Sequence, residues 1–252
     1  MHYLTDTPLA LALVSFAALW LCARFGATYL GRRAPADPEA HEDLGLVLAA
    51  TLTLLGLIIG FSFSMATSRY DLRKNYEEAE ANAIGTEYLR ADFLPEADAA
   101  RTRVLLKQYL AQRVLFYGNR DRAQLTQINT QTSALQEQLW ASVRAVGTQP
   151  NPINALVVAG MNDVLNSQGY TQAAWWNRIP RAAWTLMILI AVLCNLMLGY
   201  AVRHLKSSLG LLSVLPVVVA IAFYLIADID SPRAGFIHIR PQNLLALSDS
   251  LR

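Results

Sequence analysis

The stretch GLIIGFSFSMATSRYDLRKNYEEAEANA, residues 56–83, begins as apolar as a membrane span and ends as charged as a water-exposed helix. It contains no proline, and no glycine follows Gly60 within it. Proline and glycine are the residues that most strongly disfavour a helix interior, so nothing in this stretch ends a helix. The pattern therefore predicts one unbroken helix that leaves a membrane and continues beyond it.

The composition of the whole chain is that of a membrane protein. Of its 252 residues, 54% are apolar and only 16% are charged, which is unusual for a soluble domain. The basic residues are scattered, without the clustered face that nucleic acid requires.

Cys22 and Cys194 lie in apolar runs and act as small hydrophobic residues. The four histidines share no ligand spacing, so we predict no metal site and no cofactor.

Four apolar windows have about the 20 residues that a helix needs to cross a bilayer. We predict spans at 8–30, 44–66, 182–202 and 209–229, with residues 203–208 as a tight hairpin between the last two. No Lys or Arg precedes the first window, which favours a retained span over a signal peptide. Pro216 is expected to kink the fourth span, and Asn195 in the third to form an interhelical hydrogen bond.

The residues between the second and third spans predict an antiparallel helical bundle. The second span continues to about Leu94, and Asn151 followed by Pro152 is a typical helix start. Further helices are expected at 95–118, 121–147 and 151–178.

We therefore predict an all-α membrane protein with four transmembrane helices and a bundle inserted between the second and third. Its parts are a first membrane half at 1–66, the extramembrane bundle at 67–178, a second membrane half at 179–230 and a C-terminal tail at 231–252, in which GFIHIRP (235–241) is extended.

One face of the predicted long helix is polar from the membrane to the water. At about 100° per residue, nine of its residues, of which all but one are small, hydroxyl-bearing or charged, fall within a sector about 100° wide. They are Thr53, Gly56, Gly60, Phe63, Ser64 and Thr67, followed by Asp71, Lys74 and Glu78. We call these nine residues the stripe.

Two interpretations of the stripe remain open. Gly56, Gly60 and Ser64 have the spacing of a packing groove that admits a neighbouring helix. Alternatively, several copies of the helix surround a pore, lined by Thr53, Gly56, Gly60, Ser64 and Thr67. Phe63 is then an apolar constriction, with Phe61 as second candidate, and Asp71, Lys74 and Glu78 form charged rings at the mouth.

Other charged residues have less specific interpretations. Glu77, Glu78, Glu80 and Glu87 are expected to be a solvated helix surface rather than a calcium site, because no Asp-rich loop accompanies them. Asp228 and Asp230, where the fourth span ends, are a candidate ion or structural site. They are either functional acids or partners of a basic residue such as Arg233.

Two stretches resemble the bacterial bestrophin-like family. They are GFSFSMATSRYDLRKNYEEAEANAIGTEYLRADFLP (60–95) and IADIDSPRAGFIHIRPQNLLAL (226–247), with Arg233 where an apolar residue is expected. The resemblance is more distant to the bestrophins, pentameric ion channels whose second span lines the pore and forms an apolar neck. It implies a cyclic homo-oligomer, in which a pentamer is favoured, that conducts inorganic ions across the bacterial inner membrane, with the bundle and both termini cytosolic. The bestrophin calcium clasp is not implied, since two acids are too few.

The positive-inside rule leaves the orientation open. With both termini cytosolic, seven basic residues near span ends lie on the cytosolic side and five lie outside. If only the short loops are counted, the excess of basic residues lies on the other side of the membrane, because Arg32, Arg33, Arg203 and Lys206 then dominate.

An oligomeric ion channel in a lipid bilayer is the function that this sequence favours. The alternative is a membrane sensor or scaffold whose bundle binds a partner or small ligand. An enzyme is not expected, because the sequence has no nucleophile constellation and no phosphate-binding glycine loop. A secondary transporter is disfavoured because the four spans show no inverted repeat.

Overall fold

The computed structural model describes residues 7–31, 38–148, 151–202 and 209–252. These residues contain helices and no strand, which confirms the all-α class. The hairpin predicted at 203–208 lies outside the described residues, as do Arg32, Arg33, Arg203 and Lys206, on which the orientation count depends.

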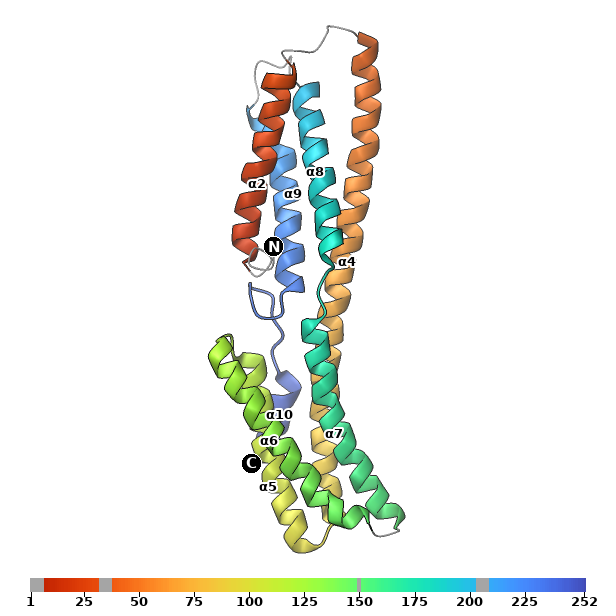
Figure 1. Cartoon of the computed structure of the whole chain (residues 1–252), viewed down its shortest axis with the longest axis vertical. Helices are drawn as coiled ribbons and strands as arrows, with labels where there is room; N and C mark the ends of the chain where they lie inside the picture. The colour runs from red at the N-terminus through yellow and green to blue at the C-terminus, as the bar shows by residue number, and fades with distance from the viewer. Residues whose placement is uncertain (1–6, 32–37, 149–150, 203–208) are drawn as a thin grey trace. The chain divides into compact units, whose positions relative to one another are not determined.

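The helices follow one another in the order that the sequence predicts, with one addition at the C-terminus (Figure 1). They are α2 (Pro8–Phe25), continued by the π-helical turn η1 (Gly26–Leu30), α4 (Pro38–Arg90), continued by the 3₁₀ turn η2 (Ala91–Phe93), α5 (Glu96–Gly118), α6 (Arg122–Gly147), α7 (Pro152–Trp176), α8 (Arg181–Ala201), α9 (Leu209–Asp230) and α10 (Gln242–Ser250).

The prediction of one unbroken helix through residues 56–83 is confirmed. Helix α4 has 53 residues, starts before the predicted span and ends at Arg90, just before Pro95. Among the described residues, four helical stretches are long and apolar enough to cross a membrane, at Pro8–Leu30, Glu42–Phe93, Pro152–Ala201 and Gly210–Asp230, and each overlaps one of the four predicted spans. Helix α9 continues through Pro216, and the predicted kink there stays a prediction.

The chain divides into two compact units. Unit 1 comprises Met1–Arg69 and Arg178–His238, in which α2 packs against α8 and α9. Its core is apolar and includes Leu19, Leu55, Met187 and Phe223. Gly26 and Gly199 bring two helices close together, because a Cβ atom at Gly26 would overlap the carbonyl oxygen of Leu196, and one at Gly199 that of Ala23. Small residues are the usual means of such close approach between membrane helices.

Asn195 differs from its prediction. Its side chain is buried in unit 1, and its amide Nδ2 donates to the carbonyl oxygen of Ala191, 2.7 Å away in the same helix. The predicted interhelical hydrogen bond is therefore wrong, since a nearby backbone carbonyl competes successfully for the amide.

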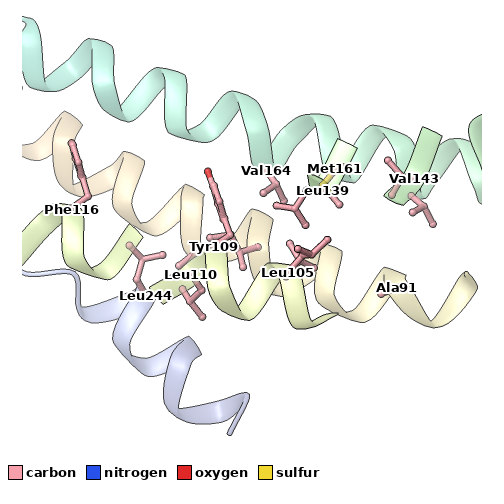
Figure 2. Close-up of a cluster of buried hydrophobic side chains, with 14 of the residues drawn as sticks. Ala91, Leu105, Tyr109, Leu110, Phe116, Leu139, Val143, Met161, Val164 and Leu244 are labelled. Carbon is pink, nitrogen blue, oxygen red and sulfur yellow. The ribbon is translucent and has the colours of Figure 1, made fainter. Parts of the chain in front are cut away.

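Unit 2 comprises Tyr70–Asn177 and Ile239–Arg252 and forms a second core. Helices α5, α6, α7 and α10 and the C-terminal part of α4 contribute to it, and Leu105, Tyr109, Leu139 and Met161 lie at its centre (Figure 2). The predicted start of α7 is confirmed, because Asn151 Oδ1 accepts from the backbone N–H of Ile153 at 2.9 Å and Pro152 follows it.

Helix α10 was not predicted. Residues 231–241 form a loop with no regular structure, and the nine-residue helix α10 follows from Gln242. Its buried Leu244 joins the unit 2 core. A helix this short has little stability of its own, so it depends on contacts with other helices that a local sequence pattern does not reveal.

Candidate functional site

The membrane part of the stripe lies at the surface of the single chain. Thr53, Gly56, Gly60 and Ser64 are exposed, and Thr67 is half-buried. A Cβ atom added at Gly56 or Gly60 would meet no atom within 4 Å. Among the described residues, therefore, no helix of the same chain occupies the small-residue groove. The groove is open to water, to lipid or to another copy of the chain.

The two candidate constriction residues point in different directions. Phe63 is 42% exposed and Phe61 is 63% exposed. Two residues along an α-helix are about 200° apart, so one axis cannot be lined by both. Phe63 shares the sector of the stripe, whereas Phe61 lies nearly opposite.

The threonine hydroxyls near and within the stripe are bonded inside α4. Thr53 Oγ1 donates to the carbonyl oxygen of Ala49 at 2.9 Å, and Thr67 Oγ1 donates to that of Phe63 at 3.0 Å. Donating to the preceding turn satisfies the hydroxyl proton without another helix. The oxygen lone pairs remain as acceptors on the helix surface.

The charged part of the stripe is also accessible. Asp71, Lys74 and Glu78 are exposed on the part of α4 that belongs to unit 2. They follow one another at three- and four-residue intervals, so they share one helix face.

The expectation of a solvated surface agrees with the exposed Glu78 but is wrong for Glu77, Glu80 and Glu87. All three are buried, and so is Arg73 on the same helix. The four residues follow one another at intervals of four, three and seven positions. This is the periodicity of a helix face that packs against other helices. That spacing was a signal in the sequence, but charged residues are seldom fully buried unless paired, and the partners come from helices far away in the chain.

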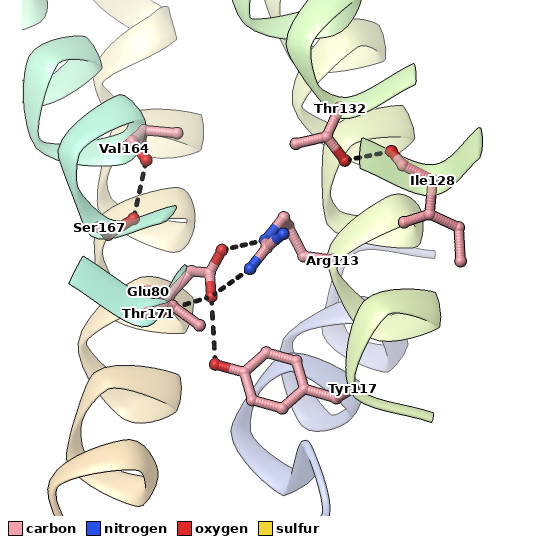
Figure 3. Close-up of polar contacts among 8 residues, drawn as sticks. All are labelled: Glu80, Arg113, Tyr117, Ile128, Thr132, Val164, Ser167 and Thr171. Atoms are coloured by element: carbon pink, nitrogen blue, oxygen red, sulfur yellow. Dashed lines mark hydrogen bonds and ion pairs between the residues drawn. The ribbon is translucent and has the colours of Figure 1, made fainter. Parts of the chain in front are cut away.

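Glu80 is the centre of a buried polar network in unit 2 (Figure 3). Its carboxylate pairs with Nε of Arg113 and also accepts from Nη2 of Arg113 at 3.4 Å. The Tyr117 hydroxyl donates to Glu80 Oε2 at 3.3 Å, and the Thr171 hydroxyl donates at 3.2 Å. Helices α4, α5 and α7 are thereby joined through one carboxylate.

The surroundings of Arg113 and Tyr117 maintain the protonation states that the network requires. Burial is the largest single cause and lowers the pKa of Arg113, but the charge of Glu80, its hydrogen bond and the neighbouring Tyr109 and Tyr117 together outweigh burial, so the pKa is raised. Burial, followed by the charge of Glu80, raises the pKa of Tyr117. Arg113 therefore stays charged and Tyr117 stays a neutral hydrogen-bond donor.

Arg73 and Glu77 bind the ends of two helices in unit 2. Arg73 Nε donates to the carbonyl oxygen of Ala174 at 3.1 Å, and Nη2 donates to that of Asn177 at 3.2 Å. Glu77 Oε1 accepts from the backbone N–H of Leu244 at 2.9 Å, in the first turn of α10. A cation thus meets the C-terminal end of α7 and an anion meets the N-terminal end of α10, as helix dipoles favour.

Asp228 holds the loop that follows α9. Its two carboxylate oxygens accept from the backbone N–H groups of Phe236 and Ile237, at 2.9 and 2.8 Å. Gly235 has φ of +94°, and a Cβ atom there would overlap the Asp228 carboxylate. Only glycine adopts this conformation without strain, and only glycine leaves room for the carboxylate.

Asp230 lies between two arginines of unit 1. Its carboxylate is 3.6 Å from Nη1 of Arg69 and 3.8 Å from Nε of Arg178, and it accepts from the backbone N–H of Ile179 at 3.2 Å. Both acids are thus engaged in structural contacts. Among the described residues, no group of three or more His, Cys, Asp or Glu side chains could hold a metal ion.

The comparisons with known proteins identify the family. A family model named the bestrophin-like domain matches residues 10–244. The chain belongs to the bestrophin-like family. The resemblance read from residues 60–95 and 226–247 is confirmed. No curated protein sequence matches this bestrophin-like chain.

Solved structures agree with this assignment. One variant of a bacterial bestrophin homologue from Klebsiella pneumoniae has 14% identity and a TM-score of 0.63, with 97% of each chain covered. A second variant has 13% identity and a TM-score of 0.64, with 97% of this chain and 98% of that chain covered. A further structure of a bestrophin homologue from K. pneumoniae has 14% identity and a TM-score of 0.58, covering 96% and 95%. The chain therefore has the bestrophin fold over nearly its whole length.

Proposed function

We propose that this chain is one subunit of a cyclic oligomeric ion channel, with a pentamer favoured, in which α4 lines the central pore. The observation that carries the proposal is the open stripe on an apolar helix. Among the described residues, no atom lies within 4 Å of a Cβ atom added at Gly56 or Gly60, and the same face continues beyond Phe63 with hydroxyl-bearing and then charged residues. Membership of the bestrophin-like family and the similarity to bestrophin homologues support the same function.

In this channel, the stripe provides a graded path for ions. Thr53 and Ser64 offer hydroxyl oxygens to a partly dehydrated ion, while Gly56 and Gly60 keep the path wide. Phe63 forms an apolar ring that a hydrated ion crosses at a cost. Rings of Asp71, Lys74 and Glu78 set the electrostatic potential at one mouth.

The surrounding parts have supporting roles. The spans at 8–30, 182–202 and 209–229 anchor α4 in the bacterial inner membrane, and the bundle at 67–178 lies in the cytosol with both termini. No catalytic step is part of this function. The alternative, a sensor or scaffold, has the same membrane anchors but conducts no ions.

Ion flux into liposomes containing the purified full chain tests the proposal. Phe63→Ala is expected to increase flux several-fold or to change ion selectivity, because it removes the apolar ring. Phe61→Ala is the matched control, since the same substitution on the opposite side of α4 is expected to leave flux unchanged.

Three outcomes separate the possibilities. An effect of Phe61→Ala without one of Phe63→Ala would assign the constriction to Phe61 and rotate the pore face. Absence of flux from a stable oligomer would favour the sensor or scaffold. An oligomer in which the stripe faces lipid would exclude the pore.

A further inference from the structure

Glu87 differs from the other buried acids of unit 2. Glu77 and Glu80 each accept several hydrogen bonds, whereas neither carboxylate oxygen of Glu87 has a hydrogen-bond partner. The Glu87 side chain is 0% exposed. A buried carboxylate without donors is costly in its charged form and much less so as a neutral acid.

The surroundings of Glu87 explain why it has no donor. The carboxyl group lies against α7 at Gly160, where an added Cβ atom would overlap Glu87 Oε2 and Arg90 Nη1. Arg90 Nη1 is 4.0 Å from Glu87 Oε2, beyond hydrogen-bond distance, and instead donates to the carbonyl oxygen of Leu156 at 3.3 Å. Arg90 is therefore an ion-pair partner of Glu87 at the longer distance only, while its Nη1 hydrogen bond goes to the backbone of α7.

We propose that Glu87 is a proton-binding site, and that loss of its proton loosens the packing of α7 against α4 within unit 2. In the neutral state, the carboxyl group fits against the α7 backbone at Gly160. In the ionised state it must gain water or a closer approach of Arg90, and either change requires the two helices to separate or Arg90 to leave Leu156.

Burial outweighs the charge of Arg90 and favours the protonated form of Glu87 at neutral pH. Burial is the largest cause and raises the pKa of Glu87 from 4.5 to about 8, the charge of Arg90 on α4 opposes this, and the charge of Asp163 on α7 adds to it. At a pH between 4.5 and about 8, Glu87 holds a proton in the folded protein that it has lost in the unfolded chain. The contribution of this bound proton to the stability of the folded protein is complete below the unfolded pKa of Glu87 and is lost as the pH rises through its folded pKa.

The site is independent of the channel function, so its test uses titration and stability of the purified full chain. Wild type is compared with Glu87→Gln, a neutral isostere, and with Glu137→Gln, the matched control at an exposed position of α6 in the same unit. The melting temperature is measured in detergent between about pH 5 and about pH 9. We expect wild type and Glu137→Gln to lose stability in parallel as the pH rises, and Glu87→Gln to lose less.

A direct titration accompanies the melting experiment. Infrared difference spectra of wild type are expected to show a protonated carboxyl band that disappears with a midpoint near pH 8 and is absent from Glu87→Gln. Parallel melting curves for wild type and Glu87→Gln would overturn the proposal. If Glu87→Gln does not fold, the wild-type spectra decide alone, and absence of a carboxyl band that titrates near pH 8 would overturn it.

Discussion

The two parts of helix α4 bury opposite kinds of side chain. In unit 1, its buried residues are Leu55, Ser62 and Ala66, and the polar stripe faces outward. In unit 2, its buried residues include charged side chains, and further charged residues lie at the surface. These buried charges are Arg73, Glu77, Glu80 and Glu87. Among the described residues, this continuous helix thus buries no charged side chain in the first unit and buries several ionisable side chains in the second.

The difference lies in where each polar group finds its partner. Thr53 and Thr67 donate to carbonyl oxygens of their own helix, so their hydroxyls need no other element. Glu80 takes its donors from α5 and α7. Locally satisfied polar groups leave a helix face free for another use, whereas groups satisfied by other helices bind those helices together. Substitutions in the two parts should therefore have very different effects on stability.

The largest effect is expected at Glu80. Glu80→Ala leaves Arg113 buried and without its carboxylate, which typically costs about 3–5 kcal/mol in the free energy of unfolding. Glu78→Ala, at an exposed position of the same helix, should change it by less than about 0.5 kcal/mol. Chemical denaturation of the purified protein in detergent measures both.

A double variant sharpens this prediction. Replacing both partners, as in Glu80→Leu with Arg113→Met, should cost less than the two single substitutions together, because no uncompensated charge remains. Strict additivity of the three measurements would show that the pair does not bind the helices.

An intermediate effect is expected at Gly199 in unit 1. Gly199→Ala places a methyl group against the backbone oxygen of Ala23, which cannot rotate away. Overpacking of this kind costs about 1–3 kcal/mol. Gly45→Ala is the matched control, because nothing lies within 4 Å of a Cβ atom there. Thermal unfolding in detergent compares the two, and equal melting temperatures would mean that α8 does not depend on close contact with the Ala23 backbone.

The smallest effect on stability is expected at Thr53. Thr53→Ala removes a hydroxyl that donates only within its own helix, so the free energy of unfolding should change by less than about 0.5 kcal/mol. Ion flux should nevertheless change if Thr53 lines the pore. A loss of stability as large as that of Gly199→Ala would show that the hydroxyl binds another helix or another subunit.

The sequence predicted most of the helices because their signals are local. Pro95 and the Asn151–Pro152 pair mark helix starts through their own backbone preferences, and the structure has both. The four spans and the unbroken course of α4 follow from long apolar or proline-free segments. Helix α10 was missed because its start depends on the carboxylate of Glu77, which lies far away in the chain.

In the candidate site, too, the sequence predicted some residue positions and not others. The membrane part of the stripe could be placed on one face of α4 from the helical period alone, and the structure leaves Thr53, Gly56, Gly60 and Ser64 exposed. The acids could not be placed so easily. Glu78 is exposed and Glu80 is buried. The helical period puts the two on nearly opposite sides of α4, but it does not say which side packs against other helices.

What the sequence determined by itself was the helical class, the four apolar spans, the bestrophin-like family and the alignment of the stripe along one helix face. These properties depend on backbone preferences, hydropathy and periodicity, which neighbouring residues decide. Only the tertiary structure decided which charges are buried, that Glu80 finds Arg113, Tyr117 and Thr171, and that Glu87 finds no donor. The free energy of a buried carboxylate depends on donors from other helices, and their positions exist only after the helices have packed.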